Sequence, residues 1–508
     1  MVLRNAVHTN LYADSVTLMR AAARIAERPG VLTASLVMGT AANQDVLDRA
    51  GLLADEGRSA GPNDLVVAVR CADDEEATAA LAAALAALAE TPDPAAPEGE
   101  VPLRALAAAP DDTDLALIST PGPYAAAEAL KALRRNMNVF LFSDHVSLAD
   151  ELTLKQEAAR RGLLVMGPDC GTSLVAGVPL GFANAVRRGG IGLAGASGTG
   201  LQQVSCLVHA MGAGVSHLIG TGSRDLSEEI GGLSTLAALD LLAADPTTEV
   251  VVLVSKPPAP RVARRVLERA AGIGKPVVAC FLGAASGTAP PGVTQVATLD
   301  EAARAAASLA LGHPVPAAET ATPRAPREPR RWVRGLYAGG TFAYEAELLL
   351  RARLGAVARE TPAPPPGAPP ALPAAHLVLD LGDDAYTTGR PHPMIDPTVR
   401  TAYLTAALDD PSTAVVLLDV VIGHGAAPDP AGEIARVLAG RQTPDDGPLV
   451  LAFVVGTDRD PQQLDVQQRL LAEAGAVVMG SGTAAARAAA DAVAGIAPQV
   501  EVRIGEGV

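Results

Sequence analysis

The chain has 508 residues, of which 49 % are hydrophobic and only 3 % aromatic, and its formal net charge at pH 7 is −16. This length is too great for one hydrophobic core, so we expect roughly two to four domains. The Ala-, Val-, Leu- and Gly-rich composition suits parallel α/β layers, and the acidic charge argues against nucleic acid or an anionic membrane as a partner.

The four cysteines, Cys71, Cys170, Cys206 and Cys280, stand far apart in the sequence. They form no CxxC or Cys/His spacing, so no structural metal site is expected. The N-terminal residues lack an apolar core of signal-peptide length, and the apolar helix near 77–89 is too short to span a bilayer. We therefore expect a cytoplasmic protein with reduced thiols.

The first predicted unit is a small N-terminal α/β domain over residues 1–110. Its helical segments, SVTLMRAAARIAER and the charged-then-alanine run at 73–90, alternate with the strand-like segments LRNAVHTNLY, VLTASLVM and NDLVVAVRC. The Pro-rich sequence TPDPAAPEGEVP at 91–102 interrupts this pattern. We expect this break to separate the unit from the next one.

Residues 111–188 are predicted to form a Rossmann-like parallel unit. The strand-like segments DLALIST, NVFLFSD and LLVMG alternate with the amphipathic segments PYAAAEALKALRRN and ADELTLKQEAARRG. In such sheets ligands bind beyond the carboxyl ends of the strands. The loops at 119–124, 143–147 and 167–173 are therefore the informative ones.

Two further units, at 189–312 and 332–500, repeat similar blocks in the same order. GLYAGGTFAYEAELLLRA matches LAGASGTGLQQVSCLVHA, LTAALDDPSTAVVLLDVV matches LAALDLLAADPTTEVVVLV, and GPLVLAFVVG matches KPVVACFLG. We interpret this as a duplicated α/β unit. A Pro- and Arg-rich linker is expected at 313–331, and the Pro-rich stretch at 362–373 is expected to be a surface loop.

Each copy has a Gly-rich turn between a strand and a helix. Glycines permit close backbone approach, and free amides at a helix start favour an anion. If the two copies pack about a pseudo-twofold axis, both helix starts converge on one phosphate-sized anion; tight strand–helix packing also explains glycine there. The candidate phosphate-binding residues are Ser197, Gly198, Thr199, Gly200, Gly339, Gly340 and Thr341.

Two other loops carry candidate substrate-binding residues. In GTGSRDL, Gly222 and Arg224 suit a carboxylate or phosphate, or else form a surface turn. In GPDCGTS, Asp169 and Cys170 follow a strand, where the thiol is either a nucleophile or a small buried side chain.

His424, in DVVIGHGAAPDP, is the candidate catalytic residue. It follows an apolar strand and is flanked by glycines, so it is placed to donate to an anion, act as an acid or base, or carry a phosphoryl group. A structural turn histidine is the alternative. His145 has a similar but weaker position, and His392 is expected to be a loop residue.

The blocks from residue 113 to 310 resemble the α subunit of the succinyl-CoA synthetase superfamily. STPGPYAAAEALKA, FSDHVSLADELTLKQEAARRGLLVMGPDCG and GGIGLAGASGTGLQQ follow that family's order, and MIDPTVRTAYLTAALDDPSTAVVLLDVV resembles the β subunit's ligase domain. Both halves in one chain, after LYADSVTLMRAA and LVMGTAAN, resemble the FdrA family over nearly the whole chain.

This resemblance implies an α/β architecture with four domains. A small N-terminal α/β domain precedes a Rossmann-like CoA-binding-type domain at 111–188. Two flavodoxin-like, succinyl-CoA synthetase ligase-type domains follow, α-like at 189–312 and β-like at 332–500.

Residues carried over by the resemblance favour a phosphate site without a phosphoenzyme. Ser197, Gly198 and Thr199 match the start of the α-type phosphate-site helix, and Gly340 and Thr341 take the β-type place. Asp169 stands where the family usually has Asn. The α-type phosphohistidine should follow PVVACFLG, but AASGTAPPG there contains no histidine, and no ATP-grasp sequence is found.

The resemblance to FdrA implies one component of a multi-protein oxamate carbamoyltransferase of anaerobic allantoin catabolism. That reaction exchanges a carbamoyl group between oxalurate and phosphate, giving oxamate and carbamoyl phosphate. Phosphate or carbamoyl phosphate is then a substrate, CoA is a possible ligand, and other subunits are expected in an oligomer. The alternatives are an acyl-CoA synthetase subunit with a separate ATP-grasp partner and a non-catalytic phosphate- or CoA-binding scaffold.

Overall fold

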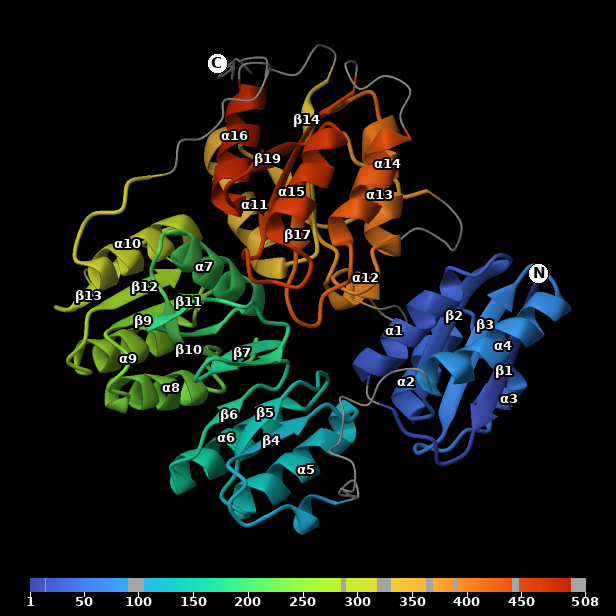
Figure 1. Cartoon of the computed structure of the whole chain (residues 1–508), viewed down its shortest axis with the longest axis horizontal. Coiled ribbons are helices and arrows are strands. Elements are labelled where there is room, and N and C mark those ends of the chain that lie inside the picture. The colour runs from blue at the N-terminus through green and yellow to red at the C-terminus, as the bar shows by residue number, and fades with distance from the viewer. Residues whose placement is uncertain are drawn as a thin grey trace, which may run out of the picture.

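Figure 1 shows the computed structural model of the chain, in which the described residues form four β-sheets with helices around them. The structure describes residues 1–13, 15–89, 105–284, 289–317, 330–361, 369–387, 392–440 and 447–494. The mixed α/β architecture expected from the sequence is confirmed. The break at 91–102 lies outside the described residues, as do most of the linker at 313–331 and residues 362–368 of the Pro-rich stretch.

The N-terminal domain is a three-stranded antiparallel sheet in the order β1-β3-β2. Alternate residues of the central strand pack on opposite faces: Val67 contacts the core with α1 and α4, and Val66 contacts the core beside α2. Helices α2 and α3 lie in a stretch for which the sequence pattern predicted no element. The elements are β1 (Val2–His8), α1 (Ser15–Ala26), β2 (Val31–Met38), α2 (Ala41–Arg49), α3 (Asp55–Arg58), β3 (Leu65–Cys71) and α4 (Asp74–Ala89).

The second sheet is parallel, in the order β4-β5-β6, with α5 and α6 packed against it. Helix α6 begins where Ser147 accepts a hydrogen bond from Asp150 N and ends at Gly162, whose φ is 68°. Phe140 and Met166 join this sheet to the core of the next unit. The elements are η1 (Leu106–Ala108), β4 (Leu115–Ile118), α5 (Gly122–Arg134), β5 (Asn138–Leu141), α6 (Leu148–Arg161) and β6 (Val165–Met166).

The first repeat is built on a seven-stranded sheet in the order β13-β12-β11-β9-β10-β7-β8. Its parallel strands β9 to β13 have the flavodoxin-like order 2-1-3-4-5. The hairpin β7–β8 pairs antiparallel with β10, so the sheet includes residues before the boundary expected at 189. The elements are β7 (Thr172–Val175), β8 (Val178–Gly181), β9 (Arg188–Ala196), α7 (Gly198–Ala210), β10 (Val215–Gly220), α8 (Leu233–Ala244), β11 (Val250–Ser255), α9 (Pro260–Ala271), β12 (Val277–Phe281), β13 (Val293–Gln295) and α10 (Leu299–Leu311).

The second repeat is a six-stranded parallel sheet in the order β15-β16-β14-β17-β18-β19. Strands β14 and β16 to β19 again give the order 2-1-3-4-5, as the duplication predicts. The elements are β14 (Trp332–Tyr337), α11 (Gly340–Leu354), β15 (Val357–Ala358), β16 (His376–Asp380), α12 (Asp384–Thr387), α13 (Thr398–Asp409), β17 (Thr413–Val421), α14 (Pro430–Ala439), β18 (Leu449–Val455), α15 (Leu464–Glu473), β19 (Val477–Met479) and α16 (Gly482–Ala494).

The two repeats lie side by side in Figure 1 and share a hydrophobic core. Leu201 and Val204 of α7 belong to the same buried cluster as Phe342 and Ala346 of α11. Equivalent helices of the two copies therefore meet at the interface, and the strand-to-helix turns before them are brought to the same place.

Within the described parts of the chain, no helix has both the length and the apolar character needed to cross a membrane.

Candidate functional site

The two predicted Gly-rich turns touch each other. Ser197 Oγ and Thr341 Oγ1 share a buried hydrogen bond of 2.7 Å. A Cβ on Gly200 would lie 3.0 Å from Thr341 Cγ2, and one on Gly339 would lie 3.0 Å from Thr199 Cγ2. Glycine at these two positions therefore permits the close approach of the two helix starts.

Both turns follow the central strand of their sheet. Strand β9 ends at Ala196 and α7 follows after Ser197, while β14 ends at Tyr337 and α11 follows after Ala338 and Gly339. The first amides of an α-helix have no acceptor within the helix, and the helix dipole makes this end positive. The arrangement thus presents two sets of amides, one from each repeat, to the same region.

A buried carboxylate holds the second turn in place. The side chain of Asp419, in β17, accepts hydrogen bonds from Ala338 N and Gly339 N, each 2.8 Å long. Arg400 Nη1 lies 3.3 Å from Asp419 Oδ1. Burial raises the pKa of Asp419, and Arg400 opposes that rise. Asp419 therefore occupies the amides before α11 and leaves those of Gly340 and Thr341 for a ligand.

Lys256 and Asp380 flank the start of α11, one from each repeat. Lys256 follows β11 and is exposed, whereas Asp380 is the last residue of β16 and is partly buried. A Cβ on Gly340 would lie 2.2 Å from Asp380 Oδ2 and 3.2 Å from Lys256 Nζ. Burial raises the pKa of Asp380 to about 6, and Lys256 opposes the rise.

Sequence reasoning missed Asp419, Lys256 and Asp380. The signal that could have found them is a charged residue in or just after a strand of apolar residues, as in VVLLDVV, VVLVSKPP and HLVLDLG. Carboxyl ends of parallel strands meet at the ligand-binding edge of such sheets.

The candidate substrate-binding residues form a second group, because their two loops pack together. Gly222 has a φ of +89°, and a Cβ there would lie 2.4 Å from Pro168 O. Cys170 is buried beside this contact, and its loss of solvation raises the pKa of the thiol to about 11. Such a thiol stays protonated at neutral pH, which favours the small buried side chain over the nucleophile.

Arg224 is engaged within the protein. Its Nη2 lies 2.8 Å from Glu151 Oε2 and donates a 2.7 Å hydrogen bond to Val146 O. Glu151 is also paired with Lys155, at 2.8 Å, and Lys155 pairs with Asp225. The guanidinium of Arg224 thus already pairs with Glu151. A role in substrate binding requires Arg224 to contact Glu151 and the substrate at the same time.

Asp169 remains open to solvent in this group. Its side chain is exposed, yet the protein surrounding it removes enough solvation to raise its pKa to about 6. Ser223 donates a hydrogen bond that opposes the rise, and the nearby carboxylates Asp144 and Asp384 add to it. Because Asp384 belongs to the second repeat, this loop faces that repeat.

His424 lies on a loop that is held firmly at the end of β17. Its N–H donates a 2.8 Å hydrogen bond to Ala183 O, and Gln462 Oε1 accepts one of 2.9 Å from Gly423 N. The imidazole is exposed, and among the described residues no hydrogen bond joins it to Ser197 or Thr341. Its catalytic role stays a prediction.

The other two histidines differ in their surroundings. His145 is exposed, with a φ of 53°. His392 lies in a loop, as expected, but its Nε2 would be 2.5 Å from a Cβ on Gly382, directly after β16. Burial, with Arg400 nearby, lowers the pKa of His392 to about 4, so it is neutral at pH 7.

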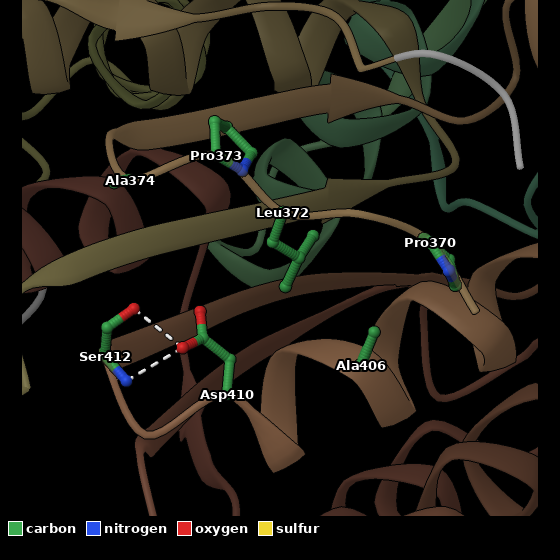
Figure 2. Close-up of a pocket in the computed structure, with 7 residues that line it drawn as sticks. All are labelled: Pro370, Leu372, Pro373, Ala374, Ala406, Asp410 and Ser412. Carbon is green, nitrogen blue, oxygen red and sulfur yellow. Dashed lines mark hydrogen bonds between the residues drawn. The ribbon is translucent and has the colours of Figure 1, made fainter.

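A shallow pocket of about 240 Å³ lies elsewhere (Figure 2). Asp410 in its wall accepts hydrogen bonds from Ser412 N and Oγ, of 2.8 and 2.7 Å. The pocket is at the amino ends of β16 and β17, opposite the edge that carries the two turns. It is therefore separate from the candidate site. It is lined by Pro370, Leu372, Pro373, Ala374, Ala406, Asp410 and Ser412.

Three family models match successive parts of the chain. Residues 1–102 match "AllF, heavy metal-associated domain", residues 187–283 match "CoA binding domain", and residues 336–492 match "CoA-ligase". The CoA-binding match thus falls on the first repeat, after the segment 111–188 that was expected to be the CoA-binding-type domain.

The N-terminal domain does not offer the ligands that the name of its family model implies. Its one cysteine, Cys71, is fully buried in β3, and burial raises the pKa of the thiol. Across the described ranges, no group of three or more His, Cys, Asp or Glu side chains is arranged to hold a metal ion. The donor set does not fit a heavy metal, and we assign none.

One relative matches nearly the whole chain, and another matches 36 % of it. It is 40 % identical over 511 residues to the protein YahF of Escherichia coli (strain K12), covering 95 % of this chain and 97 % of that one. It is 28 % identical over 188 residues to the succinate–CoA ligase [ADP-forming] subunit alpha of Methanothermobacter thermautotrophicus, covering 36 % of this chain and 60 % of the subunit.

Among solved structures, the apo form of the dinucleotide-forming acetyl-coenzyme A synthetase 1 of Ca. Korarchaeum cryptofilum matches 77 % of this chain and 85 % of its own, with 17 % identity and a TM-score of 0.34. The family rests on sequence: YahF is matched over nearly its whole length, and CoA-binding and CoA-ligase models match the two repeats. The chain therefore belongs to a succinyl-CoA synthetase-like family that includes YahF.

Proposed function

We propose that the chain is an FdrA-like component of an oxamate carbamoyltransferase, transferring a carbamoyl group between oxalurate and phosphate. The observation that supports this proposal is the 2.7 Å contact between Ser197 Oγ and Thr341 Oγ1, which brings the two helix starts together. Phosphate is held there by amides of both turns. The hydroxyl of Thr199 donates to its oxygens, as does whichever of the Ser197 and Thr341 hydroxyls accepts the hydrogen bond between them.

The chemistry requires an anion site and no phosphoenzyme. A phosphate oxygen attacks the carbamoyl carbon, and the bond from this carbon to the leaving amide nitrogen breaks. The attacking phosphate hydroxyl loses its proton, and the leaving nitrogen gains one. Fixed amide dipoles stabilise the charge that develops on the carbamoyl oxygen. The sequence AASGTAPPG, where the family's phosphohistidine would stand, agrees with direct transfer.

We assign the remaining candidate residues supporting roles. His424 acts as a hydrogen-bond donor or acid–base group at the edge that carries the turns, and Asp169 contacts the carbamoyl donor from the facing loop. Gly222 allows its own loop to lie close to residues 167–168, directly before Asp169. Other subunits complete the complex, in which the chain is one part of an oligomer.

The second candidate is an acyl-CoA synthetase subunit that receives its nucleotide site from a separate ATP-grasp partner. The matches to the CoA-binding and CoA-ligase models favour it. In that case CoA binds this chain, and a phosphoryl group passes through a carrier residue. Both candidates need an anion between the turns, but they differ in the other ligands.

Thermal shift and turnover assays separate the candidates. A ligand that binds the folded state raises its unfolding temperature. Carbamoyl transfer predicts stabilisation by phosphate and carbamoyl phosphate, and release of phosphate from carbamoyl phosphate with oxamate. Stabilisation by CoA instead, without phosphate release, would reject carbamoyl transfer in favour of the ligase.

A further inference from the structure

Lys256 and Asp380 form a pair of opposite charges that only the packing of the two repeats creates. Asp380 Oδ1 accepts a 3.1 Å hydrogen bond from Gly382 N, while Oδ2 faces Gly340. The ammonium of Lys256 faces the same glycine and makes no ion pair with any residue that the structure describes. A cation that makes no ion pair with a described residue and a carboxylate oxygen thus both lie close to one helix start.

The groups around Asp380 leave its charge weakly compensated. Asp383 and Asp419 both raise its pKa, and Lys256 lowers it. Arg400 neutralises Asp419, which it contacts at 3.3 Å. His392, beside Gly382, adds no positive charge at neutral pH. An anionic ligand that binds here therefore lies beside the ionised carboxylate of Asp380, which faces one cation, Lys256.

We propose that Lys256 and Asp380 form a proton-linked dianion site, in which a phosphate-type dianion binds beside Lys256 while Asp380 takes up a proton. This proposal rests on the proposed function, because the dianion is the phosphate of that reaction. Protonation removes the repulsion between the carboxylate and the dianion. It also turns Asp380 into a hydrogen-bond donor to an anion oxygen.

The position of Asp380 suits this exchange. Its pKa of about 6 leaves it mostly ionised in the free protein at pH 7, and a nearby dianion protonates it almost fully by raising that pKa well above the pH. A ligand with a monoanionic carboxylate repels Asp380 less than a dianion does, and it raises the pKa of Asp380 less. The affinity for a dianion therefore rises as the pH falls from 8 to 6, and the affinity for a monoanion depends less on pH.

Isothermal titration with sulfate tests the proposal, because sulfate is a dianion that does not titrate in this range. Titration at pH 7 in several buffers of different ionisation enthalpy gives the number of protons taken up. We expect about one proton per sulfate for the wild-type chain. Asp380→Asn keeps the acceptor for Gly382 N, binds sulfate at least as tightly, and takes up no proton.

Two further variants complete the comparison. Lys256→Gln weakens sulfate binding about tenfold or more, as the loss of a charge-assisted contact predicts. Asp383→Asn also removes a negative charge near the site, but it keeps the proton uptake. Inorganic phosphate displaces sulfate from the wild-type chain, and CoA does not.

Several outcomes would overturn the proposal: no proton uptake by the wild-type chain, uptake that persists in Asp380→Asn, or displacement of sulfate by CoA alone. If Asp380→Asn fails to fold, the pH dependence of sulfate affinity in the wild-type chain decides, and a flat profile rejects the linkage. Proton-linked sulfate binding without any carbamoyl transfer in the presence of the partner subunits would refute the proposed function and leave this site standing.

Discussion

Ser197 and Thr341 are 144 residues apart in sequence, yet their hydroxyl groups share a buried 2.7 Å hydrogen bond. Each residue lies at the start of a helix that belongs to a different copy of the repeated unit. The bond therefore fixes the distance between the two helix starts. A change in one turn therefore directly alters the surroundings of the other turn.

A double-mutant cycle measures this coupling. Ser197→Ala or Thr341→Val alone leaves a buried hydroxyl without its partner and should cost about 1–3 kcal/mol, whereas the double variant should cost less than the sum of the two. Urea unfolding followed by the fluorescence of Trp332, the one tryptophan of the sequence, reports on the second repeat. Strictly additive losses would show that the hydroxyls do not interact.

The interface between the repeats should also respond to pH through Glu345. Its Oε1 accepts hydrogen bonds from Leu299 N, at 2.8 Å, and Thr483 Oγ1, at 3.1 Å. Burial, reinforced by Asp300, raises the pKa of Glu345 from 4.5 to about 7. The folded state thus favours the protonated acid, and this contribution, complete below the unfolded pKa, is lost as the pH rises through about 7.

Glu345→Gln keeps the acceptor oxygen and stays neutral at every pH. Relative to wild type, its free energy of unfolding should increase between pH 5 and pH 8 by on the order of 1–3 kcal/mol. Glu473→Gln, which changes an exposed carboxylate at the end of α15, is the matched control and should show no such change. A parallel pH profile for Glu345→Gln and wild type would mean that Glu345 is ionised in the folded state.

Replacement of His424 tests its proposed role in transfer. His424→Gln keeps a neutral hydrogen-bond donor but cannot titrate, so turnover should fall about 10²–10⁴-fold, the scale of one acid–base group. The exposed His313→Gln should leave turnover unchanged. A fully active His424→Gln would make this histidine an ordinary turn residue. Acid-labile label on His424 after incubation with labelled ATP and the partner subunits would favour the ligase.

The parts of the fold that follow from local pattern were predictable. Apolar strands alternating with amphipathic helices gave the parallel sheets, and the repeated blocks gave two sheets of the same strand order. The attachment of the hairpin β7–β8 to this sheet was missed because its partner β10 lies about 40 residues further along the chain, and pairing at that range leaves no local signal.

The candidate site was predictable only where both turns had their own Gly-rich signature. Arg224 looked free in GTGSRDL, but its partner Glu151 comes from a distant helix. Lys256 and Asp380 meet only when the repeats pack, so no spacing in the sequence connects them. Contacts between units depend on tertiary geometry, which residue patterns within each unit do not encode.

Calorimetric titration with phosphate tests most directly whether one phosphate-type anion is held by both turns together. Thr199→Pro and Thr341→Pro each remove one helix-start amide, since proline has no N–H, and proline is tolerated in the first turn of a helix. We expect one phosphate per wild-type chain, with affinity weakened by either substitution and the other repeat still folded. Unchanged affinity in both variants, or two independent phosphates per chain, would contradict it.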